Sequence, residues 1–204
     1  ARKLNLKNLQ FLDLFNVYEV IYLEKNAKPS PDHETHLHLL SEAKLTEHFP
    51  GLHKDLKKYY AAMSALEIIR EIAQDNQPCP PLFDSFVFLL HHLSTAQNYS
   101  FLLANFKCKA LLWLGQSPNV SSCSVCGKAL VKTPAKVAFS YREGGILCGQ
   151  CKAGKRHDGD MSGPVLSLMA WLTTYSDAEI HAIRPAPGLQ IELTRWLDGY
   201  FQYL

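Results

Sequence analysis

Four cysteines arranged as two C-x-x-C pairs constrain this chain more than any other feature of its sequence. Cys123 and Cys126 form the first pair, Cys148 and Cys151 form the second, and residues 127–147 lie between them. A C-x-x-C turn directs two thiolates at one metal ion, and two such turns complete a tetrahedral set of four ligands. The spacing therefore predicts one structural zinc ion, Zn2+, per chain, held by all four cysteines.

The residues between the two pairs have the pattern of a small zinc ribbon. Residues 136–141 alternate in the manner of a short strand, and Gly144 and Gly145 suit a tight turn. Ile146 and Leu147 then lead directly into the second cysteine pair. We therefore expect a ribbon over residues 121–157.

Three other uses of these cysteines are open at this point. Two disulfides are possible, but the chain shows no secretory signal and C-x-x-C pairs are poor structural bridges in a reducing compartment. A thioredoxin-like redox motif needs only one C-x-x-C, placed where a helix follows a strand. A catalytic zinc ion keeps an open position with three protein ligands, whereas four thiolates leave none. The pattern favours a structural metal over all three.

The composition is that of an ordinary globular protein. Of the 204 residues, 47% are apolar, and such a chain can bury one sizeable core or two small ones. Its apolar runs fall short of the roughly 20 residues that span a bilayer. We therefore expect a cytoplasmic protein without a membrane partner.

The net charge of +2 says little about partners, but the charge is unevenly distributed. Acidic residues dominate from Asp158 onward, whereas the ribbon region from Val120 to His157 contains Glu143 as its single acid. Two interpretations are open: a patch that contacts phosphates, or the solvated surface of a ribbon with little core. The basic residues of this region are Lys128, Lys132, Lys136, Arg142, Lys152, Lys155 and Arg156.

The first part of the chain has the pattern of strands. Residues 11–25 alternate and are rich in aromatic and branched side chains, which predicts one or two strands. A polar loop at 26–32 and a further strand at 34–44 follow. His36 and His38 face the same side of that strand, but no third ligand is near in sequence, so exposed polar side chains explain them better than a metal site does.

Helical periodicity dominates from residue 49 onward. Apolar residues from Leu52 to Ile72 fall on one face of a predicted helix, and further helices are predicted at about 81–92, 99–114, 162–173 and 188–203. Gly115 suits the end of the third helix, and Ser162 with Pro164 suits the start of the fourth. The fold class predicted is α+β, mostly α.

Sequence motifs of catalysis are missing from the chain. It contains no phosphate-binding loop, dinucleotide-binding turn, H-E-x-x-H or G-x-S-x-G pattern. Asp158 and Asp160 are explained by a charged linker, and Cys79 and Cys108 by ordinary thiols. We therefore expect a protein that is not an enzyme.

Several segments, in this order, resemble the RecO family of bacterial DNA repair and recombination mediators. The most specific are Leu114–Pro118 leading into Cys123–Gly127, and Gly144–Cys148 followed by Cys151. Residues 106–112 resemble the helix before the family's ribbon, and residues 9–11 and 49–52 are also similar. The resemblance covers nearly the whole chain.

The resemblance implies a particular domain organisation. Members of the family begin with a five-stranded OB-fold barrel. Residues 1–46 would be a partial OB-fold segment, because the chain enters that barrel midway. Residues 47–120 and 158–204 would form one helical domain, with the four-cysteine zinc ribbon at 121–157 inserted into it.

The resemblance also implies a role in DNA repair, DNA recombination and the DNA damage response. Such a protein binds single- and double-stranded DNA, anneals complementary strands and acts with RecR to load RecA onto DNA coated by single-strand-binding protein. It is bacterial, cytoplasmic and nucleoid-associated. The family's basic N-terminal loop would correspond to Arg2, Lys3 and Lys7. Together with the ribbon's cations, the candidate DNA-binding residues are Arg2, Lys3, Lys7, Lys128, Lys152, Lys155 and Arg156.

By the same resemblance, the helical domain receives the acidic C-terminal tail of single-strand-binding protein. Lys107 and Lys109 are candidates for this contact by location alone, and the alternative is that they are solvated helix lysines. Two other functions remain open for the whole chain. One is a zinc-ribbon adaptor of transcription without DNA affinity, and the other is a thiol oxidoreductase that uses one C-x-x-C pair.

Overall fold

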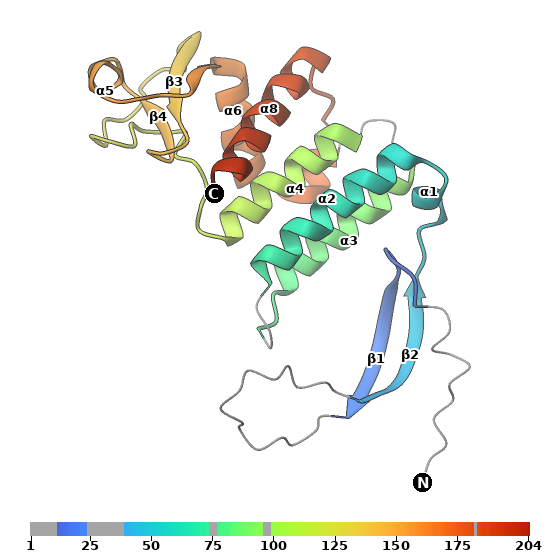
Figure 1. The fold of residues 1–204 in the computed structure, drawn as a ribbon. Coiled ribbons are helices and arrows are strands. Elements are labelled where there is room, and N and C mark those ends of the chain that lie inside the picture. Colours follow the sequence, from blue (N-terminus) through green and yellow to red (C-terminus); the bar gives the residue numbers. More distant parts are fainter. Residues whose placement is uncertain (1–11, 24–38, 74–76, 96–98, 182) are drawn as a thin grey trace, which may run out of the picture.

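The structure, a computed structural model, describes residues 12–23, 39–73, 77–95, 99–181 and 183–204. Its first element is an antiparallel pair of strands, β1 (Val17–Leu23) and β2 (Leu39–Glu47). Both strands expose apolar side chains to solvent, including Ile21 and Leu45. Figure 1 shows the pair standing apart from the ribbon, below the helices. The predicted strands are confirmed here, whereas the OB fold around them stays a prediction.

Four helices follow the strands. They are α1 (Pro50–His53), α2 (Leu56–Ile72), α3 (Pro80–Thr95) and α4 (Tyr99–Trp113). Helix α4 ends as predicted at Gly115, which has a φ of 67°. The amide of Gly115 donates to the carbonyl of Leu112, and the amide of Gln116 donates to that of Leu111. This pair of bonds is the Schellman arrangement, which a glycine at this position permits.

The ribbon sheet has three antiparallel strands in the order β4-β3-β5, and its third strand lies beyond the predicted ribbon boundary at residue 157. Its strands are β3 (Lys136–Ser140), β4 (Gly145–Leu147) and β5 (Gly159–Ser162), and the short helix α5 (Gly149–Gly154) carries the second cysteine pair. The predicted strand and glycine turn are confirmed, and Ile146 and Leu147, which lead into the second cysteine pair as expected, belong to β4. The interpretation of Asp160 as part of a charged linker is wrong, because Asp160 lies in β5 and pairs with Ala138 of β3.

Three more helices complete the described chain. They are α6 (Gly163–Thr174), α7 (Asp177–His181) and α8 (Pro187–Tyr203). Ser162 caps α6 as predicted, since its hydroxyl accepts a hydrogen bond from the amide of Val165. The same hydroxyl donates to Glu192 of α8 at 2.8 Å, so the cap also joins two helices.

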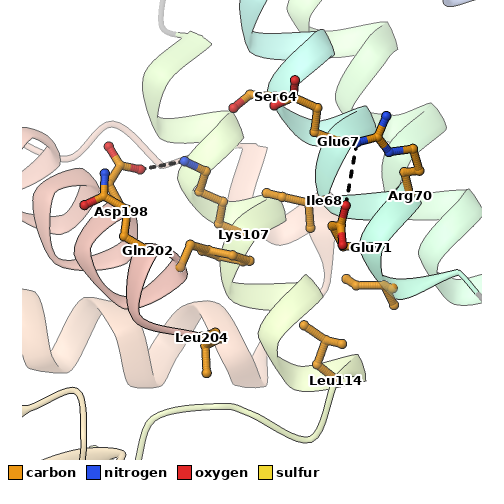
Figure 2. Close-up of a pocket in the computed structure, with 12 residues that line it drawn as sticks. Ser64, Glu67, Ile68, Arg70, Glu71, Lys107, Leu114, Asp198, Gln202 and Leu204 are labelled. Carbon is orange, nitrogen blue, oxygen red and sulfur yellow. Dashed lines mark hydrogen bonds and ion pairs between the residues drawn. The ribbon is translucent and has the colours of Figure 1, made fainter.

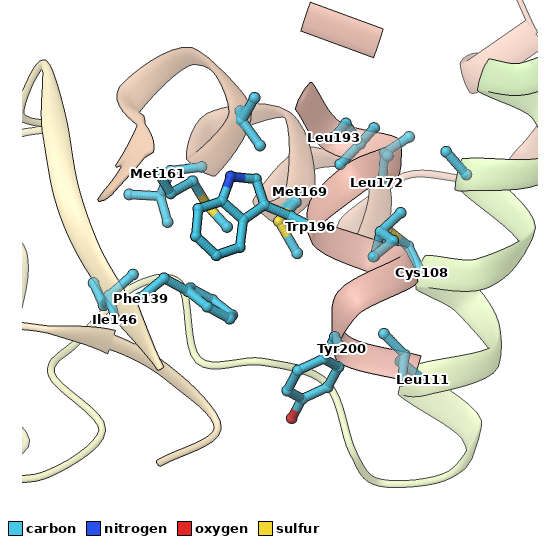
Figure 3. Close-up of a cluster of buried hydrophobic side chains, with 14 of the residues drawn as sticks. Cys108, Leu111, Phe139, Ile146, Met161, Met169, Leu172, Leu193, Trp196 and Tyr200 are labelled. Atoms are coloured by element: carbon cyan, nitrogen blue, oxygen red, sulfur yellow. The ribbon is translucent and has the colours of Figure 1, made fainter. Parts of the chain in front are cut away.

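Helix α4 lies between α2 and α3 on one side and α6 and α8 on the other (Figure 1), and a hydrophobic core lies on each side of it. One core joins α4 to α2 and α3 and includes Leu52 and Phe106. The other joins α4 to α6, α8 and the ribbon sheet, and Figure 3 shows Trp196 and Phe139 packed at its centre. The ribbon is therefore built into the helical core and is not an appended module.

The structure corrects the helix predicted from Leu52 onward. Asp55 interrupts it, and the Asp55 carboxylate accepts hydrogen bonds from the amides of Lys57 and Lys58 at the start of α2. An aspartate favours this position because it satisfies amides that have no partner within the helix. The predicted inward face is also partly wrong, because Leu56 and Tyr60 are 67% and 63% exposed. Small residues, Ala61, Ala62 and Ala65, are buried instead.

Two apolar side chains in the predicted helices at 99–114 and 188–203 are also exposed. Leu114 follows the last residue of α4 and is 37% exposed, and Ile191 of α8 is 71% exposed. The buried residues of α8 are Leu193, Trp196, Leu197 and Tyr200. The helical period was predicted correctly, but only some of the apolar residues on the predicted inward faces are buried. Across the residues described above, none of the helices is long and apolar enough to cross a membrane.

Phe139 offers a test of whether ribbon and helices unfold together. Its ring is 1% exposed and contacts Trp196 at a centroid distance of 5.3 Å. Replacing a fully buried Phe with Ala costs about 3 to 5 kcal/mol. We expect Phe139→Ala to lower the free energy of unfolding by about this amount in a single transition, measured by denaturant titration with far-UV circular dichroism and Trp fluorescence. A matched exposed change, Phe83→Ala on α3, should have a small effect. Separate transitions for the two probes would contradict the shared core.

Candidate metal centre and neighbouring surfaces

The first cysteine pair lies in a narrow loop whose ends are hydrogen bonded to each other. Ser122 and Ala129 form an antiparallel bridge, and the amide of Cys123 donates to the carbonyl of Lys128 at 2.9 Å. Gly127 has a φ of 70° and lets the chain reverse after Cys126. The amide of Ser124 donates to the carbonyl of Ile146. These bonds hold the first pair against strand β4.

The second pair is placed by the start of helix α5. Cys148 lies at the N-cap position of α5, and Cys151 lies one turn later within the helix. The carbonyl of Cys148 accepts a hydrogen bond from the amide of Lys152 at 2.9 Å. Because β4 ends at Leu147, the sheet that holds the first pair also positions the second.

The fold brings the four sulfur atoms together. All four Sγ atoms lie within 4.8 Å of one another, and those of Cys126 and Cys148 are 3.7 Å apart. Four sulfurs at the usual Zn–S distance of about 2.3 Å would be about 3.8 Å apart in a tetrahedron. The group can therefore hold a metal ion, and the prediction that both pairs serve one site is confirmed in its geometry.

Backbone amides favour thiolates within this group. Burial raises the pKa of Cys123, but the backbone N–H groups of Cys126, Cys148 and Val125 outweigh it and bring that pKa down to about 6. The backbone N–H group of Cys151 likewise lowers the pKa of Cys148. In contrast, the neighbouring sulfurs of Cys148 and Cys126 raise the pKa of Cys151 to about 12. Four thiolates this close repel one another without a cation, and a bound metal supplies the missing positive charge.

Burial of the four side chains also fits a structural centre. Cys123 is 2% exposed and packs with Ala138 and Leu147, while Cys148 and Cys151 lie against the same small cluster. Cys126 is exposed at the rim. None of the four forms a disulfide, and neither do Cys79 and Cys108. Both pairs converge on one point, whereas a thioredoxin-like site needs only one pair.

The basic residues predicted on the ribbon are partly neutralised by acids. The ammonium group of Lys152 lies 2.8 Å from the carboxylate of Asp160, and that of Lys155 lies 3.2 Å from the carboxylate of Glu143. Lys152 also lowers the pKa of Asp160 through this hydrogen bond. Lys128 and Arg156 are exposed, and within the described ranges no acid pairs with either. Arg2, Lys3 and Lys7 lie outside the described residues, as do His36 and His38.

Lys107 and Lys109 differ in surroundings although they are two residues apart on α4. Lys107 is buried, its ammonium lies 2.5 Å from the carboxylate of Asp198, and it is 5.9 Å from the ring centroid of Phe201. Its interpretation as a solvated lysine is therefore wrong. Lys109 instead donates a hydrogen bond to the carbonyl of Tyr175. The structure does not bring these two lysines together into one site.

Lys107 lines a groove of about 840 Å3 between α2, α4 and α8 (Figure 2). Its apolar lining includes Ile68, Ile72, Leu114 and Phe201. Its charged residues largely form pairs, Lys107 with Asp198 and Arg70 with Glu71, while Glu67 adds a negative charge. Sequence reasoning found Lys107 but missed Asp198, because the two are 91 positions apart and nothing local in α8 marks a partner for a buried lysine.

Comparison with known protein families supports the similarity read from the motifs. The family model described as "Recombination protein O C terminal" matches residues 53–204, which include every helix from α2 onward and the whole ribbon. The match therefore spans both pieces of the helical region and the cysteine group between them.

Individual relatives agree with the family match. The chain is 28% identical over 164 residues to the DNA repair protein RecO of Desulforamulus reducens, which covers 80% of this chain and 63% of the relative. It is 27% identical over 146 residues to the RecO of Rhodopirellula baltica, covering 72% and 52%. It is 35% identical over 115 residues to the RecO of Anaeromyxobacter dehalogenans, covering 56% and 44%. The chain thus spans less than two thirds of the length of these relatives, and it belongs to the RecO family.

Proposed function

We propose that this protein acts without catalysis in DNA repair and homologous recombination, as a mediator that binds and anneals DNA. The observation that carries this proposal is the family match over residues 53–204, together with relatives named as DNA repair proteins. The ribbon adds support, because a four-cysteine site leaves a bound metal no open position for a substrate.

The metal that we propose for the cysteine group is zinc, one ion per chain. Zinc accepts four thiolates in a tetrahedron and needs no further ligand. When bound, it would fix the first cysteine loop to helix α5. The chain's own part is to present thiolates, which the amides around Cys123 and Cys148 favour.

The zinc proposal predicts one zinc atom per chain in protein purified without chelator, measured by elemental analysis. Cys123→Ser and Cys148→Ser should each lose the metal, destabilise the ribbon and lower solubility, because metal binding contributes directly to folding of such modules. Cys79→Ser, at an exposed cysteine outside the group, is the matched control and should keep the metal. Metal-free protein with free thiols and an intact fold would contradict the proposal.

Contacts with DNA are proposed at the cationic side chains of the ribbon, with no base-specific readout. Arg156 and Lys128 are the exposed candidates without an ion-pair partner in the described part of the chain. Lys152 and Lys155 would have to exchange Asp160 and Glu143 for phosphate oxygens. Such contacts release counterions, so the affinity depends steeply on salt and weakly on sequence.

Charge reversal tests this surface. Each phosphate contact with single-stranded DNA contributes about 0.7 to the slope of log affinity against log salt. We expect Lys152→Glu, Lys155→Glu and Arg156→Glu together to flatten that slope by about 2, measured by fluorescence anisotropy with oligonucleotides of mixed sequence. The matched control reverses three exposed cations of the helical region, Lys54, Lys57 and Arg70. Equal slopes for the two triple variants would show that the ribbon cations are a solvated surface.

Protein partners are proposed because the chain belongs to the RecO family. RecR and the acidic tail of single-strand-binding protein would join this protein in loading RecA, with the tail received by the helical region. The groove that contains Lys107 is the candidate site for the tail because it combines apolar walls with a buried ammonium group. A ligand carboxylate would have to displace Asp198 from Lys107, since that charge is already paired.

If a ligand carboxylate replaces Asp198 as the partner of Lys107, substitutions of these two residues should have opposite effects on peptide binding. An acidic peptide that ends in an apolar residue should bind at micromolar affinity, roughly 8 kcal/mol, and be displaced by salt. Asp198→Asn should strengthen binding because Lys107 then lacks its internal partner, and Lys107→Gln should weaken it. Isothermal titration calorimetry measures both, with thermal melts to verify folding and Lys57→Gln as the surface control. No heat at high peptide concentration would remove this partner and favour a zinc-ribbon adaptor.

A further inference from the structure

A cleft of about 570 Å3 lies where the ribbon meets helix α8. Its lining comes from three elements: Tyr141 at the end of β3, Ser100 of α4, and Thr194, Arg195 and Gln202 of α8. One aromatic ring, one guanidinium and several neutral hydrogen-bonding groups thus face a common space. Ligand sites often form in clefts where several elements of a fold meet.

Tyr141 is held firmly at this junction. Its ring contacts those of Trp196 and Tyr200 at centroid distances of 5.8 and 6.0 Å. Its amide donates to the carboxylate of Asp158 at 2.7 Å. The hydroxyl lies against Gly199, where the absence of a side chain leaves room for it. The ring is therefore placed before any ligand arrives, so that little ordering remains to be done on binding.

Arg195 supplies the positive charge of the cleft. Its guanidinium lies 5.7 Å from the ring of Trp196, and the residue is exposed. No carboxylate of the described residues is within ion-pairing distance of it. Asp198, which also lines the cleft, is paired with Lys107. Of the residues that line the cleft, Arg195 is the cation and Asp198 the anion, and the charge of Asp198 is balanced by Lys107 from outside the cleft.

The neutral groups suit a ligand with many hydrogen-bond acceptors. The hydroxyls of Ser100 and Thr194 lie 3.4 Å apart and can each turn toward the cleft. Gln202 adds an amide. Arg142, the residue after Tyr141, is exposed on the turn that leads to β4 and extends the positive charge along the ribbon.

We propose that this cleft between the ribbon and α8 binds single-stranded DNA, with one base against Tyr141 and an adjacent phosphate on Arg195. The proposal rests on the DNA binding inferred above and gives it a site that the predicted basic residues do not include. An aromatic ring beside a cation is the combination that holds single strands without sequence preference. Bases paired inside a duplex have no free face for such a ring.

Two substitutions test the phosphate contact at Arg195 and the base contact at Tyr141 separately. Arg195→Gln removes a phosphate contact and should flatten the salt slope by about 0.7. Gly199→Ala places a methyl group against the hydroxyl of Tyr141 and should displace its ring. Base stacking on an aromatic side chain contributes about 1 to 3 kcal/mol, so this variant should bind single strands at least about fivefold more weakly with an unchanged salt slope. Lys57→Gln, at an exposed cation on α2, is the control.

The unmodified protein gives an independent measurement. A single-stranded oligonucleotide containing 5-bromouracil should form photocrosslinks that mass spectrometry assigns to the peptide containing Tyr141. Thermal melts confirm that both variants are folded. Variants that bind like the parent, or crosslinks confined to other peptides, would overturn the cleft site while leaving DNA binding by the protein intact. A parent protein that binds no DNA at low salt would instead refute the underlying function.

Discussion

The burial of helix α4 on both of its sides is the constraint on which the rest of the structure depends. It supplies Phe106 to one core and Leu111 to the other, so neither core is complete without it. Burying polar side chains of such a helix costs free energy unless other groups pair with them. Asn105 donates to Asp177 at 2.8 Å, and Lys107 pairs with Asp198. Helices far along the sequence are thus required to make α4 stable.

The sheet of the ribbon packs against one of these two cores. Phe139 and Met161 face the core that α4 shares with α6 and α8, while Ala138 and Leu147 on the opposite face of the sheet pack against the cysteine group. Free energy from metal binding on one face would therefore stabilise the packing on the other, since both faces belong to the same strands of three to five residues. A metal that lies outside the helical core can in this way determine whether that core is complete.

The sequence indicated features that local chemistry alone determines. The cysteine spacing, the left-handed Gly115 and the Ser162 cap each need only a few neighbouring residues, and all three are confirmed in their geometry. Features that depend on distant partners were missed. Strand β5 is four residues long and is defined by its pairing with β3, and Lys107 is buried because Asp198 is available in α8. Nothing beside these residues in the sequence shows such partners.

Charge pairing also changes the meaning of the ribbon's basic composition. Residues 120–157 contain seven basic side chains and one acidic one, which suggested a positively charged ribbon. That count stops just before the acidic residues that follow residue 157. Asp158 and Asp160 follow at once, and β5 returns them to the same sheet, where Asp160 meets Lys152. The positive charge that remains comes from side chains without such partners in the described structure, among them Lys128 and Arg156 of the ribbon and Arg195 of α8. Because guanidinium groups stay charged, bind phosphate in pairs of hydrogen bonds and stack on bases, a few arginines can hold a DNA strand more effectively than many neutralised lysines.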